Sequence, residues 1–596
     1  MRPRRLWLAL VLAAFCFPLF VGLDRPDLET DEAIYSFAVD RILEVGDWLA
    51  PKSSPSETEV FLEKPPLKFW IVAAPIELGL LPHNEFGLRF WDAVFGGLAF
   101  LYVFAIGSLL AGPACGATAV LLLFVHVPLV LMHGVRTNNM EAPLLLSYCG
   151  GVYHFLRWAG PGDAGRRRRH AFAAGLYFAL GFMTKFVAAL FFPFVLVLAV
   201  IGSPVRRQRL VTEWRTWFAV GAVVLALCAP WFVYAYSRFG AQLWNTILAE
   251  HVVRRLTNYL DPAHLQPWDF YVRVMWTSWS DEHVNWIALA GLTTLLVQTI
   301  RRRWFDGAVV LLWAVVPLAI ISTGTSKLYH YAFPFLPPIA LAGGYLVSLV
   351  LMLAPVPLRR ILEWVEDRAG AAIPAMRAAA ASPRAHRAAT VLVFVSAALA
   401  VGALALGHVR IDVGDATLFR SSGVWRPLAV IVAAAVATRT SARVSRLIVV
   451  ILVLNVLPLA AYREQLERLP DGHHPMRAAS ECLLRVQADA GLEPGIVFDM
   501  PEGVWHPLYY YFRRVHPVET VATPLDPALR GYLTDPSTPR PILISEDVYK
   551  QLVAQGEVPS ASSAISPPML SFLNTLLLLP GPYRVCSSEA VLHAAH

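Results

Sequence analysis

Apolar runs long enough to cross a membrane recur along most of the chain. The first follows the basic segment "MRPRR" and covers about residues 6–23. Later runs are predicted at about residues 88–110, 116–133, 141–158, 171–184, 186–202, 214–237, 283–300, 307–322, 331–353, 389–407, 425–438 and 446–461. Most approach the roughly 20 residues that a helix needs to span the hydrocarbon. The pattern predicts an α-helical polytopic membrane protein with about 13 transmembrane helices.

The composition agrees with this interpretation. Of the 596 residues, 56% are hydrophobic and only 16% are charged, which is typical of a membrane protein rather than of a large soluble core. The first apolar run has the length of a secretory signal. It lacks a small-residue cleavage site, and Pro18 and Phe20 stand where one would be needed, so we interpret it as a retained helix.

Arginine clusters between the predicted spans indicate an orientation. If the N-terminus is cytoplasmic, the clusters at residues 166–169, 206–209, 301–303, 359–360 with 384–387, and 439–446 all fall on the cytoplasmic side. A miscount of one span would place the later clusters outside. The net charge of +7 therefore reflects membrane topology, and we expect the lipid bilayer but no nucleic acid among the partners.

The character of the chain changes near residue 461. The segments "GIVFDM", "VWHPLYYYF" and "PILISEDVYKQLVAQG" suggest short strands alternating with helix, joined by proline-rich connections. The apolar run "PPMLSFLNTLLLLPGPY" is short and flanked by proline, which argues against a further span. We therefore predict a transmembrane domain at residues 1–461, with a first external loop at 24–87, and an external α/β domain at residues 462–596.

The cysteines show no CxxC pair. Cys16, Cys115, Cys149 and Cys228 lie in or beside apolar runs and are expected to be packing residues. Cys482 and Cys586 both fall in the predicted external domain, where they could form a disulfide in an oxidising compartment.

Charged and aromatic residues gather in five predicted external loops. They are Asp31, Glu32, Tyr35, Glu63, Lys64 and Arg89 in the first loop, Arg136 and Glu141 in the second, Lys185 in the third, Glu250, His251, Arg254, Arg255 and His264 in the fourth, and Lys327, Tyr329, His330 and Tyr331 in the fifth. Charges at an apolar boundary are costly without partners, so such a set on one membrane face is a hypothesis for a functional site.

Each of these residues also has an ordinary structural interpretation. Asp31 follows Thr30 and could cap a helix. Lys185 could extend from a helix end to the interface. Arg254 and Arg255 could lie against lipid headgroups on an amphipathic face. The coincidence of all five loops on one side favours the functional interpretation.

The chemistry that suits this set is transfer from a lipid-linked phosphate. Lysine and arginine neutralise the charge that develops on a leaving phosphate, and a carboxylate can take the proton from an acceptor hydroxyl. A phosphate leaves as a stable anion, so the second carboxylic acid that glycosidases use is not required. Nucleotide sugars are scarce outside the cytoplasmic membrane, so we expect a lipid-carried sugar and no nucleotide.

Several segments resemble the GT-C glycosyltransferases of the protein O-mannosyltransferase superfamily, and most of all the branch of the lipid A aminoarabinose transferases. The segments are "DEAIYS" with "GDW", "FLEKPPLKFW", "NEFGLRF", "RTNNME", "GFMTKFVAALFFP", "PWFVY" with "AEHVVRR", "HLQPWDFY" and "SKLYHYAFPFLPPIAL". They occur in the family's order across about residues 24–345, whereas residues 345–596 carry few recognisable motifs.

The resemblance implies a GT-C fold with external juxtamembrane helices, and it implies roles for individual residues. Asp31 matches the catalytic carboxylate, and Tyr35 matches a tyrosine beside it. Lys64 and Lys185 would hold the donor phosphate, helped by Arg254 or Arg255 and by Tyr331. To these we add Glu32 and Glu141 as the next candidates for the base, Lys327 as a further cation for the phosphate and Arg136 as a substrate-positioning residue. His264 and His330 are interpreted as structural or acceptor-facing.

Glu63 and His251 match positions that bind a divalent metal, zinc in the aminoarabinose branch, while magnesium or manganese stay open. Two protein ligands are too few for a closed zinc site, so a hydrogen bond between Glu63 and His251 is the alternative.

The sequence departs from the family pattern at two positions. Ile34 stands where the aminoarabinose branch usually has an arginine, and Glu141 stands where many relatives have an aspartate. Both changes leave the identity of the sugar and the acceptor open.

These observations predict an inverting glycosyltransferase of the bacterial inner membrane, with its active site and C-terminal domain on the periplasmic side. It would move a sugar from a polyprenyl-phosphate carrier to a hydroxyl or phosphate of a lipid A-like glycolipid, a protein or an envelope glycan. The alternative is a polytopic transporter or flippase of lipid-linked sugars. Transporters tend to place ionisable residues at the middle of the membrane, whereas here the polar residues gather at one surface.

Overall fold

The computed structural model describes residues 17–51, 60–258, 262–279 and 284–353, together with short segments after residue 353. It divides into two compact units. The first unit comprises Met1–Val21, Leu62–Lys68 and Phe90–Leu466, and the second comprises Gly22–Phe61, Phe69–Arg89 and Glu467–His596. Each unit is described by itself.

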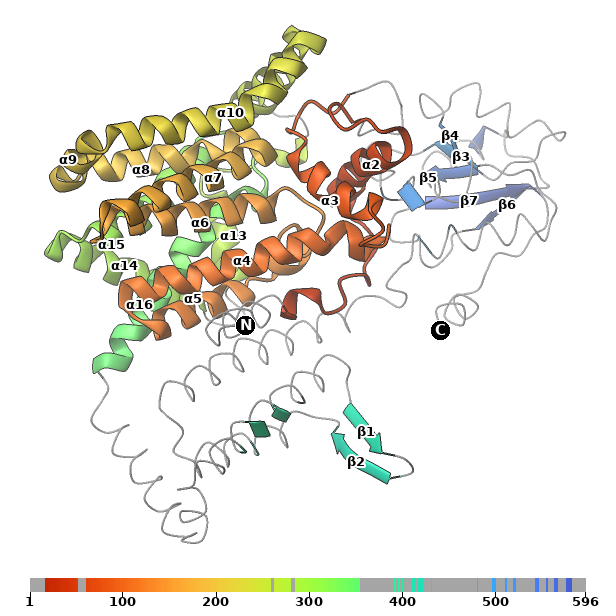
Figure 1. Ribbon diagram of the computed structural model, residues 1–596. Helices are drawn as coiled ribbons and strands as arrows, with labels where there is room; N and C mark the ends of the chain where they lie inside the picture. The colour runs from red at the N-terminus through yellow and green to blue at the C-terminus, as the bar shows by residue number, and fades with distance from the viewer. Residues whose placement is uncertain are drawn as a thin grey trace. The chain divides into compact units, whose positions relative to one another are not determined.

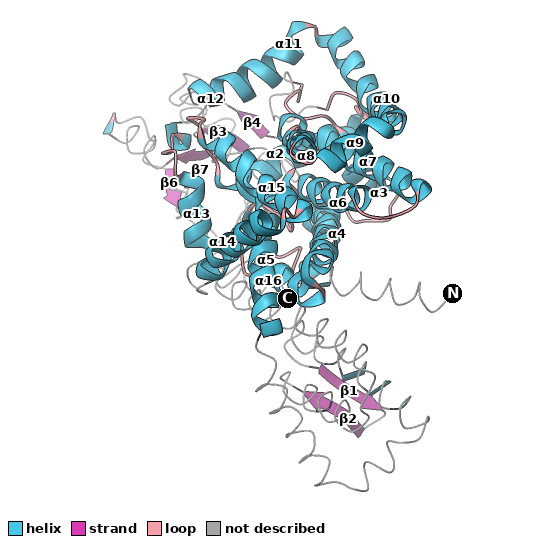
Figure 2. Ribbon diagram, turned by 90° about the vertical axis from the view of Figure 1, so that its left-hand side faces the viewer, coloured by secondary structure: helices cyan, strands magenta, loops and turns pink. Residues whose placement is uncertain are grey.

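Helices make up nearly all of the described part of the first unit (Figures 1 and 2). They are α4 (Glu85–Ala111), which begins in the second unit, α5 (Pro113–Phe124), α6 (Glu141–Ala159), α7 (Ala164–Ala189), α8 (Phe191–Ile201), α9 (Pro204–Thr212), α10 (Trp214–Phe239), α11 (Ala241–Trp244), α12 (Arg255–Thr257), α13 (Phe270–Ser278), α14 (Val284–Arg302), α15 (Phe305–Ser322) and α16 (Leu336–Leu353). A hairpin of β1 (Val409–Val413) and β2 (Ala416–Ser421) follows.

The prediction of a polytopic helical membrane protein is confirmed. Among the described residues, five helices are long and apolar enough to cross a membrane: α4, α7, α10, α15 and the segment Tyr329–Val350. Helices α8 and α9 together could form a sixth span, although they bend by 112° at the break between them. The predicted spans at 389–407, 425–438 and 446–461 fall largely outside the described residues, so the total of about 13 stays a prediction.

Small residues allow the helices of the first unit to approach closely. A Cβ atom on Gly344 of α16 would lie 2.3 Å from the carbonyl oxygen of Cys115 at the start of α5. A Cβ atom on Gly291 of α14 would lie 2.5 Å from the backbone of Ala342 in α16. Such contacts are typical of helix packing in membranes. Cys115, Cys149 and Cys228 are buried free thiols, as expected of packing residues, whereas Cys16, Cys482 and Cys586 lie outside the described residues.

Irregular backbone interrupts the helices at one end of the bundle. Two π-helices, η1 (Pro128–Met132) and η2 (Asn245–Arg254), and the 3-10 helices η3 (Pro262–His264) and η4 (Tyr329–Phe335) connect longer helices. In addition, α7 contains a kink at Lys185, where φ is −135° and ψ is 53°. Non-helical backbone at membrane depth is tolerated where it is buried in protein or lines a cavity, and π-helical turns are frequent at functional sites.

The second unit contains α2 (Thr30–Val45), most of α3 (Leu67–Glu77) and a five-stranded sheet. The strand order is β4 (Val518–Thr520), β3 (Ile496–Asp499), β5 (Ile542–Ser545), β7 (Thr575–Pro580) and β6 (Ser562–Ile565). Strand β3 runs parallel to β4 and β5, and β7 runs antiparallel to β5 and β6.

Three sequence interpretations of the C-terminal region can be compared with the sheet. Strands β3 and β5 coincide with the predicted strands in "GIVFDM" and "PILIS", and the apolar run near residue 575 forms strand β7. In "VWHPLYYYF", which we expect to belong to a region of short strands alternating with helix, Tyr510 and Tyr511 are helical. Aromatic residues favour strands in general, but here tertiary contacts of the buried Tyr510 and Tyr511 outweigh that preference.

Buried polar contacts hold the second unit together. The Tyr511 hydroxyl donates to Glu85 Oε1 at 2.8 Å and accepts from the backbone N–H of Leu28 at 2.9 Å. Arg477 forms an ion pair with the same carboxylate of Glu85. Residues from the C-terminal region are therefore bonded to the segment before α2 and to the start of α4.

Candidate active site

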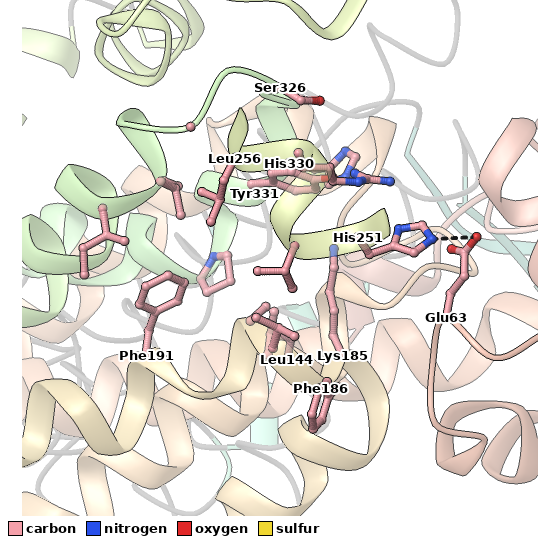
Figure 3. A pocket seen from close by; sticks show the side chains of 18 of the residues that line it. Glu63, Leu144, Lys185, Phe186, Phe191, His251, Leu256, Ser326, His330 and Tyr331 are labelled. Atoms are coloured by element: carbon pink, nitrogen blue, oxygen red, sulfur yellow. Dashed lines mark ion pairs between the residues drawn. The ribbon is translucent and has the colours of Figure 1, made fainter. Parts of the chain in front are cut away.

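A cavity of about 250 Å³ lies where several helix ends of the first unit meet (Figure 3). Its polar lining includes Glu63, Lys64, Lys185, His251, Arg255 and Tyr331, and its apolar lining includes Leu144, Phe186, Phe191, Ile247, Ile320 and Phe335. Figure 3 shows Leu144 and Phe191 on one side, and the Lys185 amine, His251 and Glu63 on the other. The cavity thus has an apolar part and a charged part.

Three cationic side chains line the charged part, and two of them lie over one aromatic ring. The Lys185 ammonium lies 5.3 Å from the centroid of the Tyr331 ring, and the Arg255 guanidinium lies 5.8 Å from it. Lys64 lines the same cavity and lies 3.5 Å from Glu63. The kink in α7 carries Lys185, and Arg255 directly follows the π-helix η2. The electron-rich ring face favours both cations, so it helps to keep two like charges close together.

Glu63 and His251 form a pair at the edge of this cluster. Glu63 Oε1 lies 3.0 Å from His251 Nε2. Loss of hydration disfavours the ionised carboxylate, but the hydrogen bond from His251 and the charges of Lys64 and Arg255 outweigh it and lower the pKa of Glu63 to about 2. The alternative foreseen from the sequence, a Glu63–His251 hydrogen bond, is therefore present.

The fit of Glu63 and His251 to a metal is limited by ligand number. A catalytic zinc site uses three protein ligands and a structural site uses four. Among the described residues, no third histidine, cysteine or carboxylate completes a metal-binding group with this pair.

A second polar group lies beside the cavity and is more deeply buried. Lys185 Nζ donates to Glu141 Oε1, His330 Nε2 lies 3.7 Å from Oε1, and His133 Nε2 lies 3.8 Å from Oε2. Candidate ligand atoms of His133, Glu141 and His330 all lie within 4.8 Å of one another. These three residues could therefore hold a metal ion.

Three other predicted site residues are not among the residues that line the cavity. Arg254 is exposed and is not among the residues that line the cavity, so of the two arginines only Arg255 does so. Lys327 is buried and donates to the backbone carbonyls of Gln266, at 2.8 Å, and of Gly324. Arg136 donates to the carbonyls of Leu19, at 3.0 Å, and of Val21.

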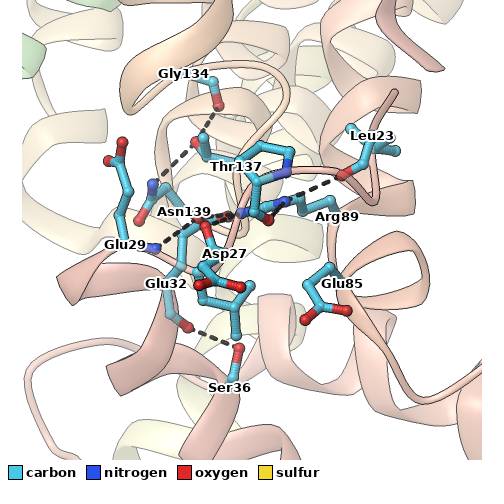
Figure 4. Close-up of polar contacts among 12 residues, drawn as sticks. Leu23, Asp27, Glu29, Glu32, Ser36, Glu85, Arg89, Gly134, Thr137 and Asn139 are labelled. Atoms are coloured by element: carbon cyan, nitrogen blue, oxygen red, sulfur yellow. Dashed lines mark hydrogen bonds and ion pairs between the residues drawn. The ribbon is translucent and has the colours of Figure 1, made fainter. Parts of the chain in front are cut away.

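Asp31, Glu32 and Tyr35 lie on α2 in the second unit. Asp31 is half-buried in the first turn of the helix, where the helix dipole favours a negative charge. Glu32 is fully buried, and its two oxygens accept from Nε and Nη2 of Arg89, both at 2.7 Å (Figure 4). Tyr35 packs against Phe61 and Phe69. Whether Asp31 faces the cavity stays a prediction.

Sequence reasoning gave no role to two buried groups. His133 lies eight residues before Glu141 in the turn "HGVRTNNMEAP". The presence of a histidine and a carboxylate in the same turn was the sequence feature that could have indicated their contact. Lys68 donates to Asp92 Oδ2 at 2.5 Å and to Asn138 Oδ1 at 3.0 Å, within the first unit. Lys68 follows Lys64 in the sequence, yet it forms a buried ion pair rather than part of the cavity wall.

The cavity and the arginine clusters lie at opposite ends of the helices. Glu141 begins α6 and Lys185 lies near the end of α7, and these two helices pack as a hairpin whose connection leads into Arg166–Arg169. Ile320 lines the cavity near the end of α15, whereas Arg301 and Arg302 lie in the last turn of α14, just before α15 begins. The separation agrees with the predicted orientation, although which end faces outward stays a prediction.

Comparison with known proteins finds a similarity to one family. Residues 63–234 match the family described as dolichyl-phosphate-mannose-protein mannosyltransferase. The chain is related to this mannosyltransferase family. The matched region contains Glu63, Lys64, Glu141 and Lys185 and ends before His251, Arg255 and Tyr331.

Relatives that match a longer part of the chain share one description. The undecaprenyl phosphate-α-4-amino-4-deoxy-L-arabinose arabinosyl transferase of Pseudomonas savastanoi pv. phaseolicola is 28% identical over 348 residues, which are 57% of this chain and 60% of that protein. The protein of the same description from Pseudomonas paraeruginosa is 26% identical over 358 residues, 58% of this chain and 60% of that protein. The chain thus matches less than two thirds of the length of these relatives.

A solved structure supports the fold assignment. The crystal structure of ArnT from Cupriavidus metallidurans bound to undecaprenyl phosphate superposes with a TM-score of 0.59 at 18% identity, covering 97% of this chain and 99% of that one. The resemblance to the ArnT-like branch and the predicted GT-C fold are confirmed by these comparisons.

Proposed function

We propose that this protein is an inverting glycosyltransferase that uses a sugar carried on a polyprenyl phosphate. The observation that carries the proposal is the joint lining of one cavity by Lys64, Lys185 and Arg255 beside an apolar wall. A lipid phosphate has the same two parts, an anionic head and an apolar chain. The names of the related transferases, which specify undecaprenyl phosphate, support this class of donor.

The charged part of the cavity suits the phosphate of the donor. The three cations outnumber the one carboxylate, Glu63, among the residues that line it. Lysine and arginine make short charge-assisted hydrogen bonds to phosphate oxygens. In a site with little water, these bonds strengthen as negative charge develops on the leaving phosphate. Leu144, Phe186 and Phe191 would contact the first isoprene units.

The reaction is a single displacement. The acceptor oxygen forms a bond to the anomeric carbon while the bond from that carbon to the phosphate oxygen breaks, so the configuration inverts. Asp31 takes the acceptor proton, and the polyprenyl phosphate leaves as an anion held by Lys64, Lys185 and Arg255. Glu32 and Glu141 are weaker candidates for the base, because Arg89 engages the first and Lys185 the second.

The proposal also assigns roles to Tyr35, Tyr331 and the Glu63–His251 pair. Tyr35 positions the substrate, and Tyr331 holds the cations. Glu63 with His251 acts as an ion pair of the site, and a divalent metal at this pair stays a prediction to which no step is assigned. The acceptor is a hydroxyl or phosphate of a lipid A-like glycolipid, a protein or an envelope glycan.

The topology follows from the same proposal. Residues 1–461 form a transmembrane domain of about 13 helices in the bacterial inner membrane, with the cavity opening to the periplasm. Residues 462–596 form a periplasmic α/β domain.

The test is transfer by the purified full-length protein in liposomes that contain a polyprenyl-phosphate sugar and a glycolipid acceptor. Asp31→Asn and Lys64→Ala are expected to lower turnover by about 100-fold or more, because the first removes the base and the second removes a charge that stabilises the leaving phosphate. If both variants keep near-wild-type transfer, the mechanism is wrong. If lipid-linked sugar crosses the bilayer without transfer, the protein is a flippase.

The two neighbouring arginines provide a matched pair for the donor site. Arg255→Ala removes a side chain that lines the cavity, and it is expected to weaken binding of a polyprenyl phosphate by about tenfold or more. Arg254→Ala removes an exposed charge from the same segment and is expected to change binding by less than about threefold. Equal effects of the two substitutions on binding to lipid-embedded protein would contradict the assignment.

A further inference from the structure

Three buried side chains of the types that bind metals lie together at the wall of the cavity, and His330 is among the residues that line it. His133 ends the π-helix η1, Glu141 begins α6, and His330 lies in the 3-10 helix η4. All three side chains are more than nine-tenths buried. The two imidazole rings stack with their centroids 3.9 Å apart and an angle of 17° between their planes. Each ring has its Nε2 within 4 Å of the Glu141 carboxylate.

Two buried polar atoms of this group lack hydrogen bonds. Oε2 of Glu141 and Nδ1 of His330 have no hydrogen-bond partner within the described part of the chain. A buried carboxylate oxygen without a partner destabilises the fold, so such atoms are rare in stable proteins. A cation bound between Oε2 and the two Nε2 atoms would remove the cost at the carboxylate.

The distances are close to those of a zinc site. Tetrahedral zinc with bonds of about 2.1 Å places its ligand atoms roughly 3.4 Å apart. The His133 and His330 Nε2 atoms lie 3.8 and 3.7 Å from the two carboxylate oxygens. These two contacts would have to shorten by a few tenths of an ångström, and the stacked rings would have to turn so that both Nε2 lone pairs meet at one point. Two histidines and one glutamate also leave a fourth position open, as in catalytic zinc sites.

The donor atoms favour one class of metal. Calcium and magnesium prefer oxygen ligands throughout, whereas imidazole nitrogens suit zinc and other first-row transition metals. We propose that His133, Glu141 and His330 bind a divalent transition-metal ion of the zinc class, at a place distinct from the Glu63–His251 pair.

At this site the Lys185 ammonium and a bound metal ion would compete for the Glu141 carboxylate. Its ammonium donates to Glu141 Oε1, so a metal on Glu141 displaces it or shares the carboxylate with it. Lys185 also lines the cavity. Metal binding would therefore free the lysine for an anion there, a consequence that rests on the proposed function. The metal site itself does not depend on that function.

The experiment measures zinc binding by the full-length protein in detergent after treatment with a chelator. Titration calorimetry and metal analysis after gel filtration are expected to give roughly one zinc per chain. His330→Asn, His133→Asn and Glu141→Gln should each weaken binding by at least about tenfold. Lys185→Met, which removes the competing charge, should strengthen it, an effect that damage to the fold would not produce.

Two further variants control for the fold and for the place of binding. His126→Asn changes a buried histidine outside the group and should leave zinc affinity within about twofold of the wild type. His251→Asn should do the same. Loss of zinc in His251→Asn but not in His330→Asn would place the metal at Glu63 and His251 and overturn the proposal. Absence of stoichiometric binding to the wild type would also overturn it.

Discussion

At the scale of single residues, two adjacent carboxylates have different surroundings. Glu32 is fully buried and paired with Arg89 through two bonds, whereas Asp31 is half-buried in the first turn of α2. The sequence places both at the same boundary and cannot tell that Glu32 pairs with Arg89, because Arg89 lies 57 residues away. Because Glu32 is paired with Arg89, we expect it to stabilise the fold. Asp31 is therefore the stronger candidate for the base that takes the acceptor proton.

Glu32→Gln tests this division. The substitution leaves the Arg89 guanidinium buried without its full countercharge, which typically costs about 3–5 kcal/mol. We expect the variant to unfold at clearly lower denaturant than the wild type, whereas Asp31→Asn should unfold close to the wild type and lose transfer. Unfolding in detergent, followed by tryptophan fluorescence, measures both. A Glu32→Gln protein of normal stability and no activity would instead make Glu32 the base.

Glu63 predicts a dependence of stability on pH. Its pKa in the folded protein, about 2, lies below the ordinary value of 4.5, so the ionised form is stabilised by folding. This contribution is fully present above about pH 5 and is lost as the pH falls from there toward 2. The wild type should therefore be more stable than Glu63→Gln at pH 7, and the difference should shrink at pH 4 and below.

The control for this measurement is Glu77→Gln, which changes an exposed glutamate at the end of α3. Its effect should be small at both pH values. Because Glu63 is partly exposed, solvent screening keeps its own effect modest. A difference between the wild type and Glu63→Gln that grows toward low pH would contradict the pairing with His251.

At the scale of elements, the apolar pattern predicted most of the helices well. The predicted spans at 88–110, 141–158, 214–237 and 307–322 correspond to α4, α6, α10 and α15. This success has a physical basis, since a segment in lipid must satisfy its backbone bonds internally and must be apolar. The kink at Lys185 and the π-helices η1 and η2 were not predictable, because their unusual dihedral angles depend on tertiary packing rather than on local preference.

The close packing of α16 against α5 gives a prediction for the helices. Gly344→Ala places a methyl group 2.3 Å from the Cys115 carbonyl oxygen, so the helices must separate. We expect a loss of about 1–3 kcal/mol, as is usual for an overpacked core. Gly221→Ala in α10 is the matched control, since its Cβ would meet nothing within 4 Å. There the better helix propensity of alanine should leave stability equal or higher.

Thermal unfolding of the two alanine variants in the same detergent measures the difference. Gly344→Ala should unfold at a lower temperature than the wild type, and Gly221→Ala should not. Equal midpoints for the two variants would show that α5 and α16 can move apart at little cost.

At the scale of the whole molecule, residues remote in sequence share each unit. The sequence predicted that Lys64, Lys185, Arg255 and Tyr331 would gather, and they line one cavity. It could not predict that Tyr511 and Arg477 bond to Glu85, because no local pattern marks contacts across about 400 residues. Nor could it separate Lys327 and Arg136, which bond to backbone carbonyls, from the cations of the cavity. Residue type and topology predict a site, whereas individual partners depend on packing.

Tyr511→Phe tests the link between the C-terminal region and the segment before α2. The hydroxyl serves both Leu28 N–H and Glu85, so its removal leaves two buried groups with one partner fewer. We expect a loss of about 1–3 kcal/mol and faster hydrogen exchange in residues 22–45. Tyr510→Phe, which keeps the ring contact with Phe37, should affect exchange there less. Unchanged exchange in Tyr511→Phe would mean that the link does not order α2.

The π-helix η2 also has a consequence for how this protein tolerates changes in length. Its wider turns set the angular position of His251 and Arg255 about the helix axis. A deletion of one residue can be absorbed if a π-helical turn becomes an α-helical turn, whereas an inserted residue would rotate everything after it by about 100°, the angle that an α-helix turns per residue. His251 would then face away from Glu63, and Arg255 away from Tyr331. Such a change of length would keep every charged side chain of the segment, but these side chains would no longer point toward the same cavity.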